Sequence, residues 1–286
     1  MKIDYISDLH IDMYFDAHKL LSEEAFRELF EDIILDYGRR TPGDVLVIAG
    51  DLGHSNEQNQ SMLHILQKRY YKHIVFVLGN HDYYLTEDLD ASEYKDSFDR
   101  VNAMRAWASK QKHIHCLDGT VVEIDGIRFG GCDGWYDGTY AYRHFEHNSY
   151  LPKESVLADL WRTANIDPKR IKGVKHFKQL WEIERKKIHQ VYRNCDIMVT
   201  HTNPSIKKEH SVESVRENKT NAFFTFDGLG YAKSGSMKYW IFGHTNTVNS
   251  YEAYGVKFVC NPIGYDDGSY MGDWSKIRSI EMEKGA

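Results

Sequence analysis

Two continuous apolar runs constrain the fold of this chain more than any other feature. Residues 45–49 read VLVIA and residues 74–78 read IVFVL, and such runs are typical of strands buried on both faces. Residues 2–6 predict an earlier strand, and helical periodicity over 19–37 and 57–70 lies between the three. The resulting β-α-β-α-β order predicts a largely parallel sheet with helices packed outside it.

The pattern changes after a third predicted helix over 92–109. Residues 121–129 predict a hairpin with a tight turn at Asp125-Gly126, and residues 176–193 predict a further helix. Four more strands are expected, at 196–200, 238–242, 256–259 and 277–282, whereas 205–236 predicts loop and a short helix. We expect one domain over 1–286, with a partly helical insertion near 137–195.

Charge and cysteine content exclude several classes of protein. The 36 Lys and Arg against 42 Asp and Glu give a net charge of −6, which argues against a passive nucleic-acid coat. The first residues carry no apolar signal region and no stretch is long enough to span a bilayer. Cys116, Cys132, Cys195 and Cys260 are widely spaced, as expected of buried thiols rather than disulfides. These features predict a soluble cytoplasmic protein without a membrane partner.

Five short polar segments follow predicted strands. They are Asp8-Leu9-His10, Gly50-Asp51, Gly79-Asn80-His81-Asp82, Thr200-His201 and Gly243-His244-Thr245-Asn246. Each one alone is also compatible with an ordinary turn or a surface histidine. Together they place carboxylate, imidazole and amide donors at strand ends, where α/β sheets bind their ligands.

This donor set indicates a metal centre. Carboxylate, imidazole and amide oxygen suit divalent ions such as Mn, Fe, Zn, Ni or Co. The donors outnumber what one ion needs, so two ions that share a carboxylate account for them best. Paired ions are a known device for displacement at phosphorus.

The same five segments, in this order, resemble the motifs of the calcineurin-like metallophosphoesterases. The resemblance runs from residue 3 to about residue 265 and includes the segments 131–135 and 260–265. It implies an α/β fold in which two packed, mixed β-sheets are flanked by helices as a four-layer sandwich. It also implies a metal-bound hydroxide as the nucleophile.

The resemblance assigns roles to single residues of this chain. Asp8 and His10 would bind the first metal, and Asp51 would bridge both. Asn80, His201 and His244 would complete the second site. His81 would face the substrate, either as general acid or as a phosphate contact. Asp82 would orient His81, with a merely structural role as the alternative.

Two positions depart from the family pattern. Asn246 stands where relatives usually have a second histidine that binds the first metal, and an amide oxygen favours a harder ion such as Mn²⁺. Asn246 is therefore expected to bind that ion loosely, or to cap its loop and leave the metal to water. His54 stands where many relatives have an aspartate, which argues against a protein phosphatase.

The leading hypothesis is a hydrolase of phosphomonoesters or phosphodiesters that acts on a small phosphorylated substrate with two divalent ions. A nuclease of the same superfamily is one alternative, although the net charge gives nucleic-acid binding no support. A non-catalytic protein-binding scaffold is the other. The insertion is expected to cap the site, and it contains Tyr140, Tyr142, Arg143, His144 and His147 as candidate phosphate or base contacts, or as a solvated face.

Overall fold

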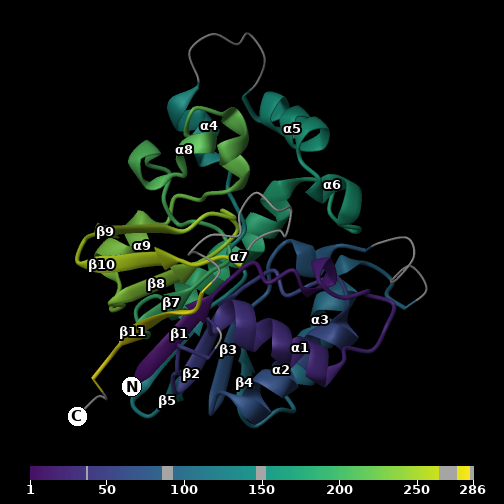
Figure 1. The fold of residues 1–286 in the computed structure, drawn as a ribbon. Coiled ribbons are helices and arrows are strands. Elements are labelled where there is room, and N and C mark those ends of the chain that lie inside the picture. Colours follow the sequence, from purple (N-terminus) through teal and green to yellow (C-terminus); the bar gives the residue numbers. More distant parts are fainter. Residues whose placement is uncertain (37, 86–92, 146–152, 264–275, 284–286) are drawn as a thin grey trace.

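The computed structural model describes residues 1–36, 38–85, 93–145, 153–263 and 276–283. Within these residues, two β-sheets pack face to face, and helices cover both outer faces (Figure 1). The predicted α/β fold of two packed mixed sheets flanked by helices is confirmed. His147 and the end of the segment 260–265 lie outside the described residues.

The first sheet has the strand order β11-β1-β2-β3-β4. Its strands are β1 (Lys2–Ile6), β2 (Val45–Ala49), β3 (His73–Val77), β4 (Ile114–Cys116) and β11 (Arg278–Glu281). β1 to β4 run parallel, and β11 joins the edge of β1 antiparallel. The parallel sheet expected from the β-α-β-α-β order is therefore present, with one antiparallel edge strand.

The second sheet has the order β5-β6-β7-β8-β10-β9. Its strands are β5 (Thr120–Ile124), β6 (Ile127–Gly131), β7 (Ile197–Val199), β8 (Tyr239–Phe242), β9 (Asn249–Ala253) and β10 (Val256–Cys260). β6, β7, β8 and β10 are parallel, and the hairpin partners β5 and β9 are antiparallel. The mixture follows from connection length, because short turns join β5 to β6 and β9 to β10.

The helices fall between these strands. The α-helices are α1 (Glu23–Leu29), α2 (Asn56–Arg69), α3 (Ser97–Ala108), α4 (Thr139–His144), α5 (Lys153–Ala164), α6 (Asp167–Arg170), α7 (Phe177–Val191), α8 (Glu213–Arg216) and α9 (Leu229–Ser234). Among the described residues, the short 3₁₀ segments are η1 (Ile11–Met13), η3 (His81–Tyr83), η4 (Lys208–His210) and η5 (Lys219–Phe223), and η2 (Phe30–Ile34) is a π-helical turn. In Figure 1, α4 and α5 lie at the top of the view, above the two sheets, and α6 lies below α5.

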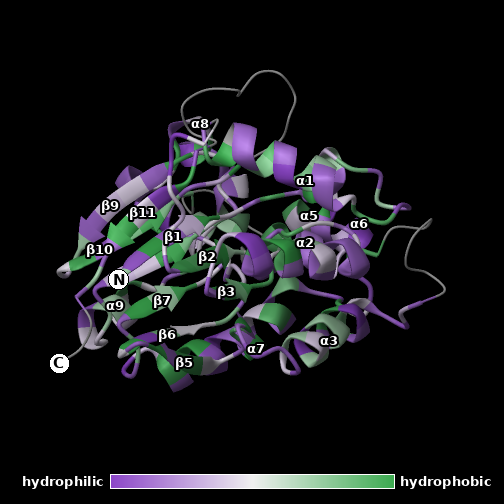
Figure 2. Ribbon diagram, turned by 60° about the horizontal axis from the view of Figure 1, so that its bottom comes forward, coloured by the Kyte–Doolittle hydropathy of each residue, from purple (hydrophilic) through white to green (hydrophobic). Residues whose placement is uncertain are grey.

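Three apolar clusters define the layers. Val45, Val47 and Ala49 of β2 point into a cluster between the sheets, together with Ile197 and Ile241 of the second sheet. Leu46 and Ile48, from the opposite face of the same strand, pack under α1 to α3. A third cluster joins the outer face of the second sheet to α7 and α9. Burial on both faces explains the unbroken apolar runs, and Figure 2 shows the central strands mainly as hydrophobic.

The structure corrects three details of the sequence prediction. The helix expected over 19–37 begins only at Glu23, where Ser22 caps it by accepting a hydrogen bond from the backbone N of Ala25, and it continues from Phe30 as a π-helical turn. The short strand β4 was not predicted, nor was β9, which carries alternating polar residues. β4 pairs with β3 and β9 pairs with β10, and pairing with these more apolar strands compensates for their weak local pattern.

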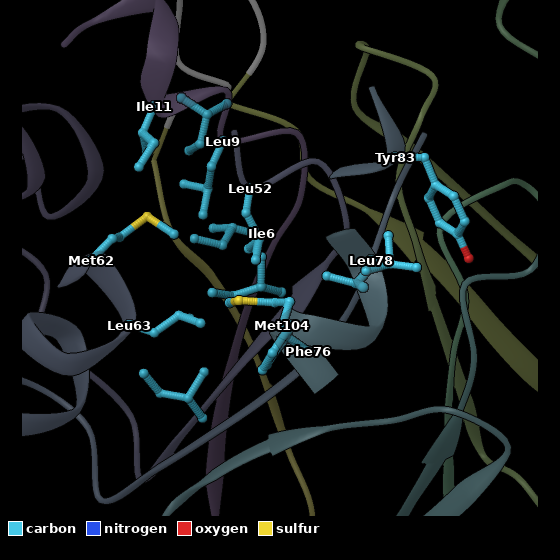
Figure 3. Packing of buried hydrophobic residues seen from close by; sticks show 14 of the residues in the cluster. Ile6, Leu9, Ile11, Leu52, Met62, Leu63, Phe76, Leu78, Tyr83 and Met104 are labelled. Atoms are coloured by element: carbon cyan, nitrogen blue, oxygen red, sulfur yellow. The ribbon is translucent and has the colours of Figure 1, made fainter. Parts of the chain in front are cut away.

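Apolar side chains fix the loops that carry the polar segments. Leu9, between Asp8 and His10, is 3% exposed, and Leu52, next to Asp51, is fully buried. Figure 3 shows both side chains in the cluster that contains Met62 of α2. These contacts hold the two loops against the core, so their polar neighbours have little freedom to move.

Candidate metal centre

The predicted ligands gather where the central strands end. Asp8 and His10 follow β1, Asp51 follows β2, Asn80 follows β3, and the two histidines follow β7 and β8. The side chains of Asp8, His10, Asp51, Asn80, His201 and His244 are all buried. Buried polar groups need partners, so a cluster of this size requires either a dense hydrogen-bond network or bound cations.

Asp51 lies at the middle of this cluster. Its Oδ2 is 3.3 Å from His201 Nε2 and 3.6 Å from His10 Nε2. Its Oδ1 accepts a hydrogen bond of 2.9 Å from the backbone N of His81. The carboxylate thus has histidines on two sides while a backbone donor fixes its plane.

Two groups of possible metal ligands overlap at this carboxylate. One consists of His10, Asp51 and His81, and the other of Asp51, His201 and His244, with all ligand atoms of a group within 4.8 Å of one another. Asp51 is the member that both groups share. The donor atoms therefore have the spacing that two cations sharing one carboxylate would use.

Carbonyl groups select the nitrogen that each of two histidines turns toward the cluster. The Nδ1 of His201 is 2.8 Å from the Ala49 carbonyl oxygen, and the Nε2 of His244 is 2.9 Å from that of Phe223. A carbonyl only accepts, so these nitrogens donate. When the rings are neutral, the electron pairs lie on His201 Nε2 and His244 Nδ1. Such anchoring is typical of metal-binding histidines.

The backbone is strained at the candidate ligands. Asp8, His10, Asp51, His244 and Asn246 have positive φ values of 51°, 42°, 55°, 66° and 48°. A non-glycine residue in this region costs on the order of 1–3 kcal/mol, and such residues concentrate at functional sites. Packing of the core must offset this strain energy. The strained backbone directs the side chains of each loop into one cluster.

Glycine permits the closest approach in the centre. A Cβ atom on Gly79 would lie 2.1 Å from Asp51 Oδ1, so no other residue fits there. Gly50 has a φ of +87°, and a Cβ there would lie 2.4 Å from His201 Nδ1. The glycines of the predicted segments therefore let the β2 and β3 loops meet around Asp51.

Asp8 is anchored by neighbours of the cluster. Its Oδ1 and Oδ2 lie 3.0 and 3.1 Å from the backbone N of His244, and Ser7 Oγ donates to Oδ2. These bonds join the ends of β1 and β8. Burial raises the pKa of Asp8, against the opposing effect of the charge on His201. A carboxyl group buried beside Asp51 favours a cation in its vicinity.

Asn246 has an unsatisfied oxygen. Its Oδ1 is buried and has no hydrogen-bond partner among the described residues. A buried polar atom of this kind costs about 1–3 kcal/mol unless a further group satisfies it. The orphaned oxygen is compatible with the ligand role expected from its position two residues after His244.

The pKa values of the histidines diverge. Burial lowers the pKa of His201, but the Asp51 carboxylate outweighs it and the pKa is raised to about 10. Burial, with the charge of His201, lowers the pKa of His244 to about 3. Without a cation the cluster therefore holds its positive charge next to Asp51, whose own pKa is lowered well below its usual value despite burial.

His81 belongs to a chain of side chains that the sequence did not show. Its Nδ1 is 3.0 Å from His54 Nε2, and His54 Nδ1 is 3.0 Å from Asp12 Oδ2. Asp12 also accepts from the backbone N of His54, at 3.1 Å. With Asp12 as acceptor, His54 donates through Nδ1 and accepts from His81 Nδ1. In the sequence, His54 is a departure from the family pattern, and Asp12 carries no signal that links it to the site.

Asp82 lies below the loops. Its Oδ2 accepts from the backbone N of Gly79 at 2.8 Å and of Leu52 at 3.3 Å, and its Oδ1 lies 3.4 Å from Asn59 Nδ2. Burial, together with the Asp51 charge, raises its pKa to about 7. These bonds join the β2 and β3 loops, which is the structural alternative considered for this residue.

A third acidic group has a structural explanation. Asp118, Asp133 and Glu184 have carboxylate oxygens close enough for a metal. Arg105, however, lies 2.5 Å from Asp133, and Lys187 lies 2.6 Å from Glu184 and 2.5 Å from Asp118. Two cationic side chains thus pair with the three carboxylates of this group, which links α3 and α7.

The candidate contacts in the insertion are mostly used for packing. Tyr140 is buried and donates to the carbonyl of Arg216 at 2.6 Å, and His144 Nε2 is 2.7 Å from the carbonyl oxygen of Ile206. His144 and Arg143 also line a surface cavity of about 730 Å³. Within the described part of the chain, no helix has both the length and the apolar content that crossing a membrane requires.

A sheet sandwich with aspartates and histidines at its strand ends defines a class of metal-dependent hydrolases. The family model for calcineurin-like phosphoesterases matches residues 1–247. The chain belongs to this family, as the order of its motifs predicted. A protein of Acanthamoeba polyphaga mimivirus, uncharacterized protein L509, is 22% identical over 283 residues, covering 91% of this chain and 90% of that protein.

A solved structure has the same fold. Phosphopantetheinyl hydrolase (PptH) from Mycobacterium tuberculosis superposes with a TM-score of 0.71 and 13% identity, over 98% of this chain and 95% of that one. The agreement extends over nearly the whole of both chains.

Proposed function

We propose that this protein hydrolyses phosphate esters with a pair of divalent cations. The observation that carries the proposal is the position of Asp51, whose Oδ2 lies 3.6 Å from His10 Nε2 and 3.3 Å from His201 Nε2, so that histidines of both proposed sites face one carboxylate. The proposed ligands are Asp8 and His10 for one ion, Asn80, His201 and His244 for the other, and Asp51 for both. Asn246 would complete the first site, and its amide oxygen favours Mn²⁺ over softer ions.

The bound pair would supply an activated water molecule as the nucleophile and would offset charge on the phosphate oxygens. The side chains have separate tasks. Asp51 holds charge between the two sites, and its plane is fixed by the backbone N of His81. The histidine anchors on Ala49 and Phe223 keep the imidazoles in place before a cation arrives.

His81 is proposed to contact the substrate. Its Nδ1 lies 3.0 Å from His54 Nε2, so Nε2 is the ring atom that we assign to the leaving oxygen or to a phosphate oxygen. A protonated Nε2 would donate to the leaving oxygen, a step typically worth about 10²–10⁴-fold in rate. The chain Asp12–His54–His81 fixes the ring orientation that either role needs.

Metal analysis and two substrates test the proposal. Purified protein should contain up to two ions per chain and should hydrolyse p-nitrophenyl phosphate or bis-p-nitrophenyl phosphate after Mn²⁺ is added. The ratio of the two rates assigns monoester or diester preference. A protein that binds no divalent ion and is inert on both substrates would instead be a binding scaffold on this fold.

His81→Ala distinguishes the two roles of His81. If His81 donates a proton, the variant should lose more activity on an alkyl phosphate than on a nitrophenyl phosphate, because nitrophenolate leaves without help. A phosphate contact predicts equal losses. Metal content should equal that of the unmodified protein in both cases.

A further inference from the structure

The amide group of Asn80 is held in one orientation by side chains outside the strand-end loops. Its Nδ2 lies 2.8 Å from Tyr84 Oη and 2.9 Å from Asp167 Oδ1. Its Oδ1 faces the other way, 3.0 Å from His201 Nε2. Only the oxygen of an amide has an electron pair to offer a cation, so this orientation decides whether Asn80 can be a ligand.

Asp167 accepts several hydrogen bonds in a buried site. Tyr84 donates to its Oδ1 and Tyr136 to its Oδ2, both at 2.5 Å, in addition to Asn80 Nδ2. The residue is 1% exposed. Burial raises the pKa of Asp167, and the hydrogen bonds from Tyr136, Tyr84 and Asn80 oppose that shift by favouring the ionised carboxylate, which is a pure acceptor. A pure acceptor can bond only the NH₂ side of Asn80, which excludes the flipped amide.

The insertion provides this carboxylate. Asp167 begins α6, its backbone N lies 3.0 Å from Asn165 Oδ1, and the Ile171 backbone N donates to its carbonyl. Trp161 of α5 donates through Nε1 to Tyr136 Oη at 2.7 Å. The position of Asp167 is therefore determined by the fold of α5 and α6, and the sequence distance to Asn80 is 87 residues.

We propose that Asp167 is a positioning residue for metal binding: it holds the Asn80 amide with Oδ1 toward the centre. The inference rests on the proposed function, in which Asn80 is a metal ligand. It implies that a residue of the insertion contributes to the affinity for the cation. Partners of this kind typically account for about 10–100-fold in metal affinity.

The two tyrosines offer a matched test. Tyr84 and Tyr136 bond the same carboxylate, but of the two only Tyr84 also contacts Asn80 in the recorded hydrogen bonds. Tyr84→Phe should weaken the binding of one Mn²⁺ by up to about 10-fold, and Tyr136→Phe should change it little. Both variants remove one hydroxyl from the same buried site. Tyr136→Phe also removes the acceptor of the Trp161 Nε1–H, so the folding of the two variants is compared by thermal unfolding in EDTA.

Substitutions of Asp167 separate its hydrogen bond from its charge. Asp167→Asn keeps an acceptor for Asn80 and should retain most of the affinity, whereas Asp167→Ala should lose about 10–100-fold. Asp137→Ala is the control, because Asp137 is a buried aspartate at the start of the insertion that bonds the backbone N of Thr139 and Asp227.

Mn²⁺ affinity is measured by competition with a fluorescent chelator, and thermal unfolding in EDTA reports folding separately. Weaker binding in Tyr84→Phe than in Tyr136→Phe, and in Asp167→Ala than in Asp137→Ala, supports the inference. Equal affinity within each pair overturns it while the proposed function stands. Loss in Asp167→Asn as large as in Asp167→Ala overturns the orienting role in favour of charge. If Asp167→Ala does not fold, the tyrosine pair decides. Unmodified protein that binds no Mn²⁺ overturns both proposals.

Discussion

The rings of His54 and His81 are parallel to within 4°, and His54 Nε2 lies 3.0 Å from His81 Nδ1. The His54 imidazole links His81 to Asp12, whose Oδ2 lies 3.0 Å from His54 Nδ1. The ring of His81 is thereby oriented by the His54 imidazole, which is held in turn by the Asp12 carboxylate.

This relationship predicts an effect of His54 on chemistry rather than on metal binding. His54→Ala should lower the rate on an alkyl phosphate by about 10-fold, part of what a general acid contributes, and should lower the rate on a nitrophenyl phosphate less. His64→Ala is the control, an exposed histidine on α2 that lies 3.2 Å from Gln111 Oε1. An equal loss on both substrates, or loss of metal, would contradict the prediction.

Asp51 should be the most damaging single ligand to lose. Because it belongs to both ligand groups, Asp51→Asn removes charge from two sites, and activity and metal content should fall together. Metal analysis and turnover are measured on the same sample. Asp4→Asn serves as control, since Asp4 is equally buried but bonds Gly43, Tyr71 and Ser279 outside the centre. Full metal occupancy in Asp51→Asn would refute the bridging role.

Asn246 should make the first site the weaker one. Dialysis should remove one ion before the other, and added Mn²⁺ should restore activity. Asn246→His should slow that loss and shift the preference toward softer metals, because imidazole binds them better than an amide oxygen does. Thr247→His places an imidazole on the next, exposed residue and should change neither property. Unchanged affinity for both ions in a folded Asn246→His variant would show that Asn246 is not a ligand.

The histidines at the start of β3 and β4 predict acid sensitivity. Burial, with His113, lowers the pKa of His73; Asp125 opposes the shift and Lys72 adds to it. Burial, with His73 and His113, lowers the pKa of His115. The unfolded chain therefore binds more protons as pH falls below the ordinary value of 6.5, and stability is lost there.

The double variant His73→Gln/His115→Gln measures this contribution. Urea unfolding in EDTA at about pH 7.5 and about pH 5.5 should show a smaller loss of stability in the variant than in the unmodified protein. His64→Gln should show the full loss. The same pH dependence in all three proteins would place acid sensitivity elsewhere.

Leu9 should couple the core to the metal centre. Leu9→Ala and Leu63→Ala empty similar space in one cluster, and each should cost about 2–5 kcal/mol of unfolding free energy. Only Leu9 lies between two candidate ligands, so only Leu9→Ala should also weaken Mn²⁺ binding at a temperature where both variants are folded. Equal affinity in the two variants would count against a core that fixes the loop.

The sequence by itself determined the strands with apolar runs and the residues that follow them. Val45 to Ala49 could be recognised because a strand buried on both faces needs apolar residues at every position. Asp8, Asp51, Asn80, His201 and His244 could be grouped because parallel strands end at one edge of a sheet. Both inferences need only local pattern and topology.

Tertiary structure alone decided which side chains support that cluster. Asp12 and His54 are brought to His81, and Asp167 to Asn80, by loops and an insertion with no periodic signal. β4 and β9 form for a related reason, since their partner strands rather than their own residues favour the extended backbone. The left-handed φ values at Asp8 and Asp51 belong to this category too, because only a packed core can hold a non-glycine residue in a conformation that its own sequence disfavours.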